Sequence, residues 1–217
     1  MTNNLIVDKK KANILILAPH TDDGEFGCGA TISKFVNENA RVFYAAFSLA
    51  EESVPIGYPK NILATEVKNA TKILGVNSED LLLYKYRVRY FAYHRQEILE
   101  DLVQLNLKIA PDLVFMPSLN DLHQDHTTIA HEGLRAFKKT SILSYEMPWN
   151  NMNFATQSFV SLKDEYLEKK ISALNCYESQ KGKSYASEEY ITSLARTRGQ
   201  QIGVRFAEVF EVVRWIM

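Results

Sequence analysis

Short apolar runs alternate with segments of helical periodicity along the first two thirds of the chain. Repeated strand–helix units joined by short loops predict βαβ units and a parallel sheet. Because crossovers between parallel strands are right-handed, the carboxyl ends of all these strands should share one edge. The runs that read as buried strands are residues 13–18, 41–48, 81–86, 113–116 and 142–146. The segments that read as helices are residues 25–39, 61–74, 95–110 and 127–138.

The last third of the chain is less regular. Residues 148–160 are rich in Asn and aromatic side chains and show no clear period. Residues 161–164, Ser-Leu-Lys-Asp, resemble a capping box that opens a helix. A second helix is expected at 188–196 and a last strand at 205–216. No repeat or linker interrupts the 217 residues, so we expect a single domain over 1–217.

Composition excludes several classes of function. Hydrophobic residues make up 46% and charged residues 24%, as in an ordinary soluble globular protein. The formal net charge is -1 without a long basic run, which speaks against a nucleic-acid partner. Cys28 and Cys176 form no CxxC pair, which fits a reducing compartment. No apolar run approaches the ~18 residues of a transmembrane segment, so we expect a cytoplasmic protein, with a homo-oligomer left open.

Polar clusters follow the first and the fourth apolar runs. His20 and Asp23 lie in the first cluster, after Pro19, and His126 lies in the second. Neutral imidazoles and carboxylates are the usual ligands of a catalytic zinc ion, which keeps one position open for water. If the two strands are neighbours in the sheet, His20, Asp23 and His126 can supply three ligands to one metal.

The other polar members of the two clusters suit the remaining steps of a hydrolysis. Asp22 can act as a general base beside the metal, and His123 can protonate a leaving group or hold an oxyanion. Asp125 can orient an imidazole. The simpler alternative, that the first cluster is only a helix N-cap, weakens because two such clusters follow buried strands. His94 and His131 lie outside these clusters, and we expect surface or packing roles for them.

A glycine-containing turn raises a different class of function. Gly27-Cys28-Gly29 after a strand hints at a dinucleotide-binding fingerprint, but Ile32 stands where the third glycine should be. Two aspartates ahead of the glycines would repel phosphates. We therefore favour close packing of a helix on the sheet as the role of these glycines, and keep a nucleotide-binding module as the alternative.

Two further segments are candidates for the wall of a binding pocket. Trp149 can stack on a sugar ring, and Asn150 and Asn151 can form hydrogen bonds with it. Packing of Trp149 within the loop is an equal alternative, because aromatic side chains mostly pack. Glu51 and Glu52 follow the second apolar run, and an ordinary solvated loop is the preferred interpretation there.

The sequence resembles a known family at this point. PHTDDGEFGCGAT and LHQDH resemble the two signature motifs of the PIG-L/LmbE-like zinc-dependent N-deacetylases, and the resemblance extends to the tail RGQQIGVRFAEVFEVVR. It implies a Rossmann-like α/β fold, with a mostly parallel sheet and helices on both faces. It also implies removal of an N-acetyl group from an N-acetylglucosamine-like sugar or sugar conjugate. By position, His20, Asp23 and His126 resemble the zinc ligands, although such donors also accept Fe²⁺, Co²⁺ or Mn²⁺.

The resemblance assigns the other site residues too. Asp22 resembles the general base, and His123 resembles the residue that faces the oxyanion or leaving amine, with Asp125 as its supporting partner. The chain departs from the family at Thr21, where Pro or Ala is frequent, and at Gly24, where Glu is frequent. A metal-binding homologue without turnover is a further alternative, against which the intact Asp22 and His123 argue.

Overall fold

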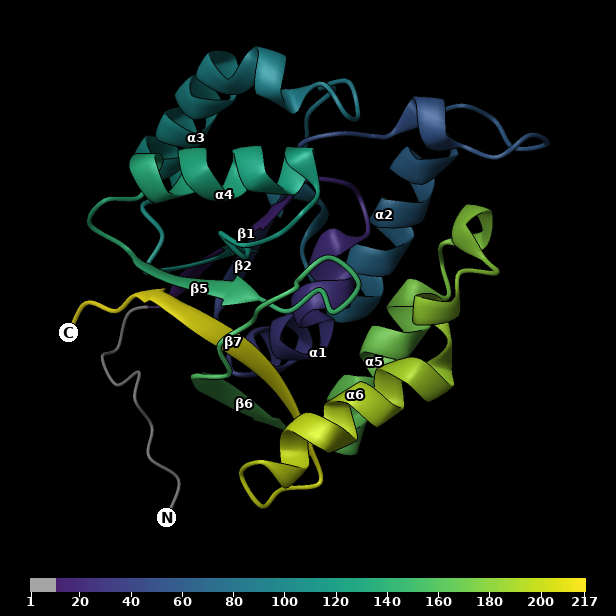
Figure 1. Cartoon of the computed structure of the whole chain (residues 1–217), viewed down its shortest axis with the longest axis vertical. Coiled ribbons are helices and arrows are strands. Elements are labelled where there is room, and N and C mark those ends of the chain that lie inside the picture. Colours follow the sequence, from purple (N-terminus) through teal and green to yellow (C-terminus); the bar gives the residue numbers. More distant parts are fainter. Residues whose placement is uncertain (1–10) are drawn as a thin grey trace.

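The computed structural model describes residues 11–217, and within them seven strands form one sheet in the order β3-β2-β1-β4-β5-β7-β6 (Figure 1). Neighbours among β1 to β5 run parallel, whereas β7 is antiparallel to both β5 and β6. The α/β fold with a mostly parallel sheet is therefore confirmed. The strands are β1 (Asn13–Ala18), β2 (Arg41–Ala46), β3 (Leu81–Leu83), β4 (Leu113–Pro117), β5 (Ser141–Tyr145), β6 (Ser158–Leu162) and β7 (Phe206–Arg214).

Helices cover both faces of the sheet, as Figure 1 shows. On one face α3 packs against α4, and on the other α1, α2 and α5 pack together, with α6 against β7. Alternation along β1 explains this: Ile14 and Ile16 belong to the core on one face, and Leu15 and Leu17 to the core on the other. The helices are α1 (Asp23–Asn37), α2 (Ile62–Leu74), α3 (Arg95–Ile109), α4 (Gln124–Ala136), α5 (Asp164–Leu174) and α6 (Glu188–Gln200). None of the helices within 11–217 is both long and apolar enough to cross a membrane.

The order of the strands places the two polar clusters together. β1 pairs directly with β4, so that Ile16 lies opposite Phe115. Because both strands are parallel, the loops that leave their carboxyl ends emerge side by side at the same edge of the sheet. The two strands are thus neighbours in the sheet, as a metal site shared by the two clusters requires.

The expectations for the last third were wrong in one element. Residues 158–162 form strand β6, which pairs antiparallel with β7. The sequence showed no strand periodicity in this segment, and the segment's end was predicted to begin a helix. β6 is an edge strand of mostly intermediate burial, so its sequence lacks the apolar run of a central strand. Ser161 lies within β6 and not at a helix start; Lys163 precedes α5 and makes no side-chain cap bond.

Helix α1 contains a break that is held from elsewhere in the fold. Cys28 has φ -151° and ψ 25°, outside the helical region. Beyond the break, the carboxylate of Glu208 in β7 accepts hydrogen bonds from the backbone N–H groups of Ala30 and Thr31, at 3.2 and 2.7 Å. Lys170 in α5 donates to Glu208 and to the carbonyl of Phe26 before the break. A buried ion pair thus ties both halves of α1 to two later elements.

Candidate metal centre

The turn after β1 is organised by a carboxylate. The backbone N–H of His20 donates to Oδ2 of Asp23 at 2.7 Å, which closes the turn at the start of α1. Asp22 occupies the N-cap position of α1 but makes no side-chain cap hydrogen bond. The helix-cap alternative is therefore wrong for Asp22, whose carboxylate lines a pocket instead.

Three donor atoms, from the turn after β1, from α1 and from α4, form a nearly equilateral triangle. Nδ1 of His20 lies 3.0 Å from Oδ2 of Asp23, Nε2 of His126 lies 3.2 Å from the same oxygen, and the two nitrogens are 3.3 Å apart. Ligands about 2.0–2.1 Å from a tetrahedral metal are themselves about 3.3 Å apart. The donor set and its spacing therefore fit a divalent ion.

The charges around the triangle favour a cation. Burial opposes charge on His20, but Asp23 and Asp125 outweigh it and raise its pKa to about 9. Burial likewise opposes charge on His126, yet Asp23 and Asp121 raise its pKa to about 10. Burial acts to raise the pKa of Asp23, but the two imidazoles outweigh burial and hold that pKa well below the usual range. A site that stabilises protons on its imidazoles in this way also stabilises a metal ion in their place.

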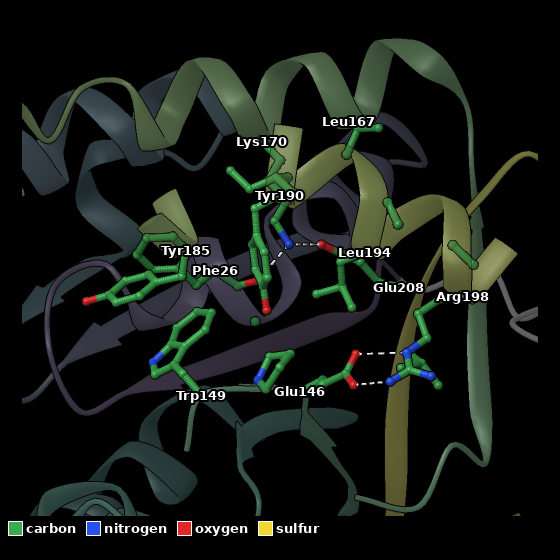
Figure 2. Close-up of a pocket in the computed structure, with 16 residues that line it drawn as sticks. Phe26, Glu146, Trp149, Leu167, Lys170, Tyr185, Tyr190, Leu194, Arg198 and Glu208 are labelled. Atoms are coloured by element: carbon green, nitrogen blue, oxygen red, sulfur yellow. Dashed lines mark hydrogen bonds and ion pairs between the residues drawn. The ribbon is translucent and has the colours of Figure 1, made fainter. Parts of the chain in front are cut away.

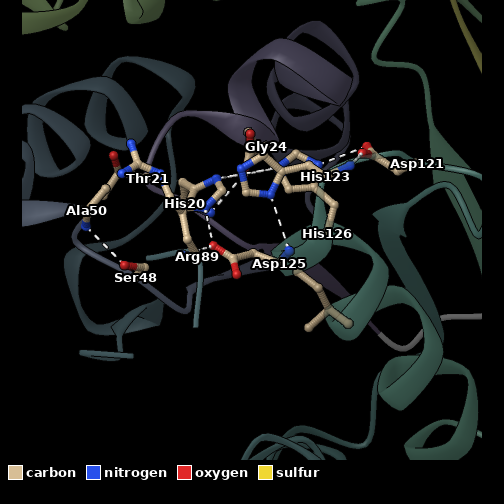
Figure 3. A network of polar contacts seen from close by, with 12 residues as sticks. His20, Thr21, Gly24, Ser48, Ala50, Arg89, Asp121, His123, Asp125 and His126 are labelled. Carbon is tan, nitrogen blue, oxygen red and sulfur yellow. Dashed lines mark hydrogen bonds and ion pairs between the residues drawn. The ribbon is translucent and has the colours of Figure 1, made fainter. Parts of the chain in front are cut away.

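Each imidazole of the triangle has its own carboxylate partner (Figure 3). Nε2 of His20 lies 3.0 Å from Oδ2 of Asp125, and Nδ1 of His126 lies 2.8 Å from Oδ2 of Asp121. Carboxylates in this position fix the tautomer and orientation of ligating imidazoles. Asp125 was expected to support His123, but its carboxylate contacts His20 instead.

The geometry at the start of α4 explains the partner of Asp125. His123 is the N-cap of α4, and its Nδ1 accepts a hydrogen bond from the backbone N–H of Asp125 at 3.2 Å. The backbone of Asp125 thus meets His123, while its side chain reaches His20 and the backbone N–H groups of Arg89 and Phe91. Sequence reasoning missed Asp121, although its place in the same polar loop was a usable signal.

His123 is set up as a hydrogen-bond donor. With Nδ1 accepting, a neutral ring carries its proton on Nε2. Burial and the neighbouring imidazoles lower the pKa of His123 to about 4, so the neutral ring prevails. His20, His123 and His126 also bring ring nitrogens within 4.8 Å of one another, which makes a three-imidazole ligand set the alternative. We prefer the set with Asp23, because its three donor separations are shorter and nearly equal.

The departure from the family motif at Gly24 has a structural reason. A Cβ atom on Gly24 would lie 2.5 Å from the ring of Tyr44, whose hydroxyl accepts a hydrogen bond from the Gly24 N–H. Glu25 is fully buried, which raises its pKa to about 8, and it contacts the hydroxyls of Tyr44 and Tyr177. Both hydroxyls also reach the carbonyl of Thr21. The two tyrosine hydroxyls have only two protons for four oxygen–oxygen contacts, so a protonated Glu25 supplies a third donor to the network.

The glycines after the turn serve packing. A Cβ atom on Gly27 would lie 2.3 Å from the ring of Tyr145 in β5, so only glycine fits there. The hydroxyl of Tyr145 in turn donates to the carbonyl of Leu17 in β1. Close contact between α1 and the sheet, as favoured above, is therefore the observed role of Gly27.

The metal triangle opens into a pocket of about 250 Å³. One wall is aromatic: Trp149 stacks on Tyr185 with ring centroids 4.3 Å apart, and the ring of Phe26 meets both edge to face. Figure 2 shows these rings beside a second, much smaller cavity of about 30 Å³. The ion pair of Glu146 with Arg198 lies in that cavity's lining. Trp149 is 37% exposed, and its ring both packs in the wall and lines the pocket.

The remaining sequence candidates lie around the rim or away from the pocket. Asn150 lines the pocket, whereas Asn151 accepts a hydrogen bond from the backbone N–H of Met147. Glu51 and Glu52 are exposed in a short 3-10 turn, as expected for a solvated loop. His94 is a surface residue paired with Glu97.

Comparison with known proteins places these features in a wider group. The family model described as "PIG-L: GlcNAc-PI de-N-acetylase" matches residues 15–137. The chain is 25% identical over 174 residues to the uncharacterized deacetylase YaiS of Escherichia coli K12, covering 78% of this chain and 92% of that protein.

Solved structures share the whole fold. N,N'-diacetylchitobiose deacetylase from Pyrococcus horikoshii superposes with a TM-score of 0.78 at 23% identity, covering 94% of this chain and 85% of that one. GalB, the 4-carboxy-2-hydroxymuconate hydratase of Pseudomonas putida, superposes with a TM-score of 0.77 at 18% identity, covering 95% and 98%. At such identities the likeness concerns the fold alone, and the fold serves more than one reaction.

Proposed function

Because the chain belongs to the PIG-L family, we propose that it is a zinc-dependent N-deacetylase that hydrolyses the N-acetyl group of an N-acetylated sugar or sugar conjugate. The observation that carries this proposal is the triangle of His20, Asp23 and His126. Asp22 and His123, which are not part of the triangle, line the same pocket and are free to act on a substrate. Both free cysteines fit a cytoplasmic setting, which forms part of the proposal.

The metal would be held by Nδ1 of His20, the Asp23 carboxylate and Nε2 of His126. When bound there, a divalent ion supplies Lewis acidity for the acetyl carbonyl and a water of lowered pKa. Zinc suits this mixed set of nitrogen and oxygen ligands, and Fe²⁺, Co²⁺ or Mn²⁺ are the alternatives.

Asp22 serves as the base in this proposal. Burial raises the pKa of its carboxyl, with a further rise from the charge of Asp23. A carboxylate that is more basic than usual accepts the proton of the attacking water more readily. The same group, now protonated, can return that proton to the leaving amine. The overall step consumes one water and yields acetate and a free amine.

His123 serves the developing negative charge. Its Nε2–H is available for the carbonyl oxygen of the acetyl group, because Nδ1 is occupied by the Asp125 N–H. A donor placed where an oxyanion develops strengthens its hydrogen bond in the transition state. His123 thereby assists collapse of the tetrahedral species and release of the amine without changing its own charge.

Acetate release tests the proposal directly. The zinc-loaded protein should free acetate from at least one member of a panel of N-acetyl sugars and their nucleotide and lipid conjugates, as followed by mass spectrometry. Product that gains the mass of water without losing acetyl would indicate a hydratase instead. A metal-loaded protein that releases no acetate from the whole panel would support the non-catalytic alternative, and tight nucleotide binding by calorimetry would support the nucleotide-binding one.

The carboxylate behind His126 should affect the metal and not the chemistry. Asp121→Asn keeps the shape of the side chain but removes its charge, so metal affinity should fall by about 10–100-fold, as is typical of such supporting groups. Competition with a chelating dye measures the affinity. Asp164→Asn, an exposed carboxylate on α5, is the control. Equal affinities in the two variants would exclude Asp121 from the support of the metal.

Trp149 should contribute to binding of the sugar. Trp149→Ala removes an aromatic surface of the pocket, and the KM should rise about three- to tenfold, the range of one aromatic contact. Metal content should stay at the wild-type value. Trp215→Ala provides a control, because Trp215 is exposed near the C-terminus. Unchanged kinetics in Trp149→Ala would leave this side chain with a packing role alone.

A further inference from the structure

Two cationic side chains line the pocket outside the metal triangle. They are Arg89, from the loop after β3, and Lys183, from the loop between α5 and α6. Neither takes part in the hydrolysis described above. The acidic residues of the pocket lining are Asp22 and Asp23, which lie at the metal end.

Arg89 is held at the pocket by its backbone, and its guanidinium has little else to bind. Its φ of 70° is in the left-handed region, and its N–H donates to Oδ2 of Asp125 at 2.6 Å. Nη2 contacts Oγ of Ser53 at 3.2 Å, and among residues 11–217 no carboxylate lies within 4.0 Å of the guanidinium. Its neighbour Arg87 differs, since it pairs with Glu52 and lies over the ring of Tyr90. Arg89 therefore keeps most of its donors for a ligand.

Lys183 shows the same contrast with a neighbour on its own loop. Lys181 is paired with Glu178, whereas no carboxylate within the described residues lies within 4.0 Å of Nζ of Lys183. The ammonium lies 5.6 Å from the centroid of the Tyr185 ring in the pocket wall. Burial works against its charge, but Asp22 more than compensates and raises the pKa of Lys183. Lys183 is thus a cation at neutral pH.

The balance of charge defines what the outer pocket accepts. With a divalent ion at the triangle, the charges of Asp22 and Asp23 are matched. Asp121 and Asp125 are buried behind the imidazoles and are hydrogen-bonded there. The acidic residues that line the pocket then leave Arg89 and Lys183 without a counter-charge. Two cations in the lining of one pocket suit a group with two negative charges.

We propose that Arg89 and Lys183 form a subsite for a phosphate group carried by the N-acetyl sugar. The preferred substrate is then an N-acetylhexosamine that bears a phosphate or diphosphate, in place of a neutral sugar. A sugar phosphate, a nucleotide sugar and a lipid-linked sugar all share this chemistry. The assignment of a substrate class rests on the proposed function, while binding of the anion itself does not.

Comparison of neutral and phosphorylated substrates tests the subsite. The zinc-loaded protein is assayed on N-acetylglucosamine, N-acetylglucosamine 1-phosphate, a nucleotide diphosphate conjugate and a polyprenyl diphosphate conjugate. The best phosphorylated substrate should exceed the neutral sugar by about tenfold or more in kcat/KM, as expected for a charge-assisted contact. The ranking among the three phosphorylated substrates identifies the source of the phosphate.

Matched variants assign the preference to the two residues. Arg89→Gln and Lys183→Gln should each reduce the ratio of phosphorylated to neutral kcat/KM severalfold, chiefly through KM. Arg87→Gln and Lys181→Gln should keep the wild-type ratio, because those side chains are paired with Glu52 and Glu178. A neutral sugar hydrolysed as efficiently as its phosphates, or equal ratios in all four variants, would overturn the proposal while the deacetylase function stood.

A binding measurement keeps the two proposals separable. Calorimetry with inorganic phosphate on the zinc-loaded protein should show binding that Arg89→Gln and Lys183→Gln weaken and that the two control variants preserve. If no substrate releases acetate although zinc is bound, the deacetylase proposal fails, and this titration still decides the subsite. A phosphate affinity that is unchanged from wild type in all four variants would exclude the subsite.

Discussion

Replacing Asp22 with asparagine is expected to lower kcat by about 10²–10⁴-fold, the usual contribution of a general base, while zinc stays bound at the wild-type ratio. The reason is geometric: Asp22 lines the pocket next to the triangle, but the triangle itself is made by its neighbour Asp23. Asparagine keeps the size of the side chain and cannot accept the proton. Metal content and acetate release should be measured on the same purified sample.

Two companion variants make this result decisive. His123→Ala should also retain zinc and lose rate, because its Nε2–H serves the transition state. Asp112→Asn, whose carboxylate accepts the N–H of Asn13 at the opposite end of β1, is the matched control and should keep full activity. An Asp22→Asn protein with wild-type turnover would remove the base from the mechanism, and with it the main support for hydrolysis.

Replacing Asp23 with alanine is expected to cost the metal itself. Its Oδ2 lies 3.0 Å from Nδ1 of His20 and 3.2 Å from Nε2 of His126, and the same atom accepts the His20 N–H that closes the turn. Zinc affinity should fall by more than the about 10–100-fold expected for a supporting carboxylate such as Asp121. Activity should return in part when zinc is supplied in excess.

The two aspartate variants can also reveal an exchange of roles. If Asp22→Asn came out metal-free while Asp23→Ala stayed loaded and slow, ligand and base would be swapped. Melting curves of the metal-free form of each variant and of metal-free wild type separate metal loss from unfolding, because no sample then contains the ion. An Asp23→Ala protein that binds zinc like the wild type would point to the three-imidazole set with His123.

The sheet and the meeting of the two polar loops followed from sequence because central strands are marked by continuous apolar runs. In a parallel sheet, such runs also dictate where loops emerge, so the loops that carry His20, Asp23 and His126 could be predicted to meet. Strand β6 was not predicted from the sequence, because a half-buried edge strand has no such run.

The supporting network around the turn could not be predicted in the same way. Tyr44 and Tyr177 are far apart in sequence, yet both hydroxyls meet at the carbonyl of Thr21 and the carboxylate of Glu25. Nothing in local periodicity specifies such a pairing. The partner of Asp125 was missed for a related reason, because the direction of a side chain in the first turn of a helix depends on what the neighbouring loop offers.

The break in α1 bears on how far this fold can be divided. The segment matched by the family model ends at residue 137 and contains every proposed ligand, the base and His123. Yet the backbone N–H groups of Ala30 and Thr31, which lie just beyond the break, donate to the carboxylate of Glu208 in the last strand. Lys170 in turn donates to that carboxylate. A fragment that stopped at residue 137 would contain every proposed ligand, the base and His123 but would lack Lys170 and Glu208, which hold its first helix in place. The proposed ligands, the base and His123 therefore depend on the part of the chain after residue 137 for the support of α1, although none of them lies in that part.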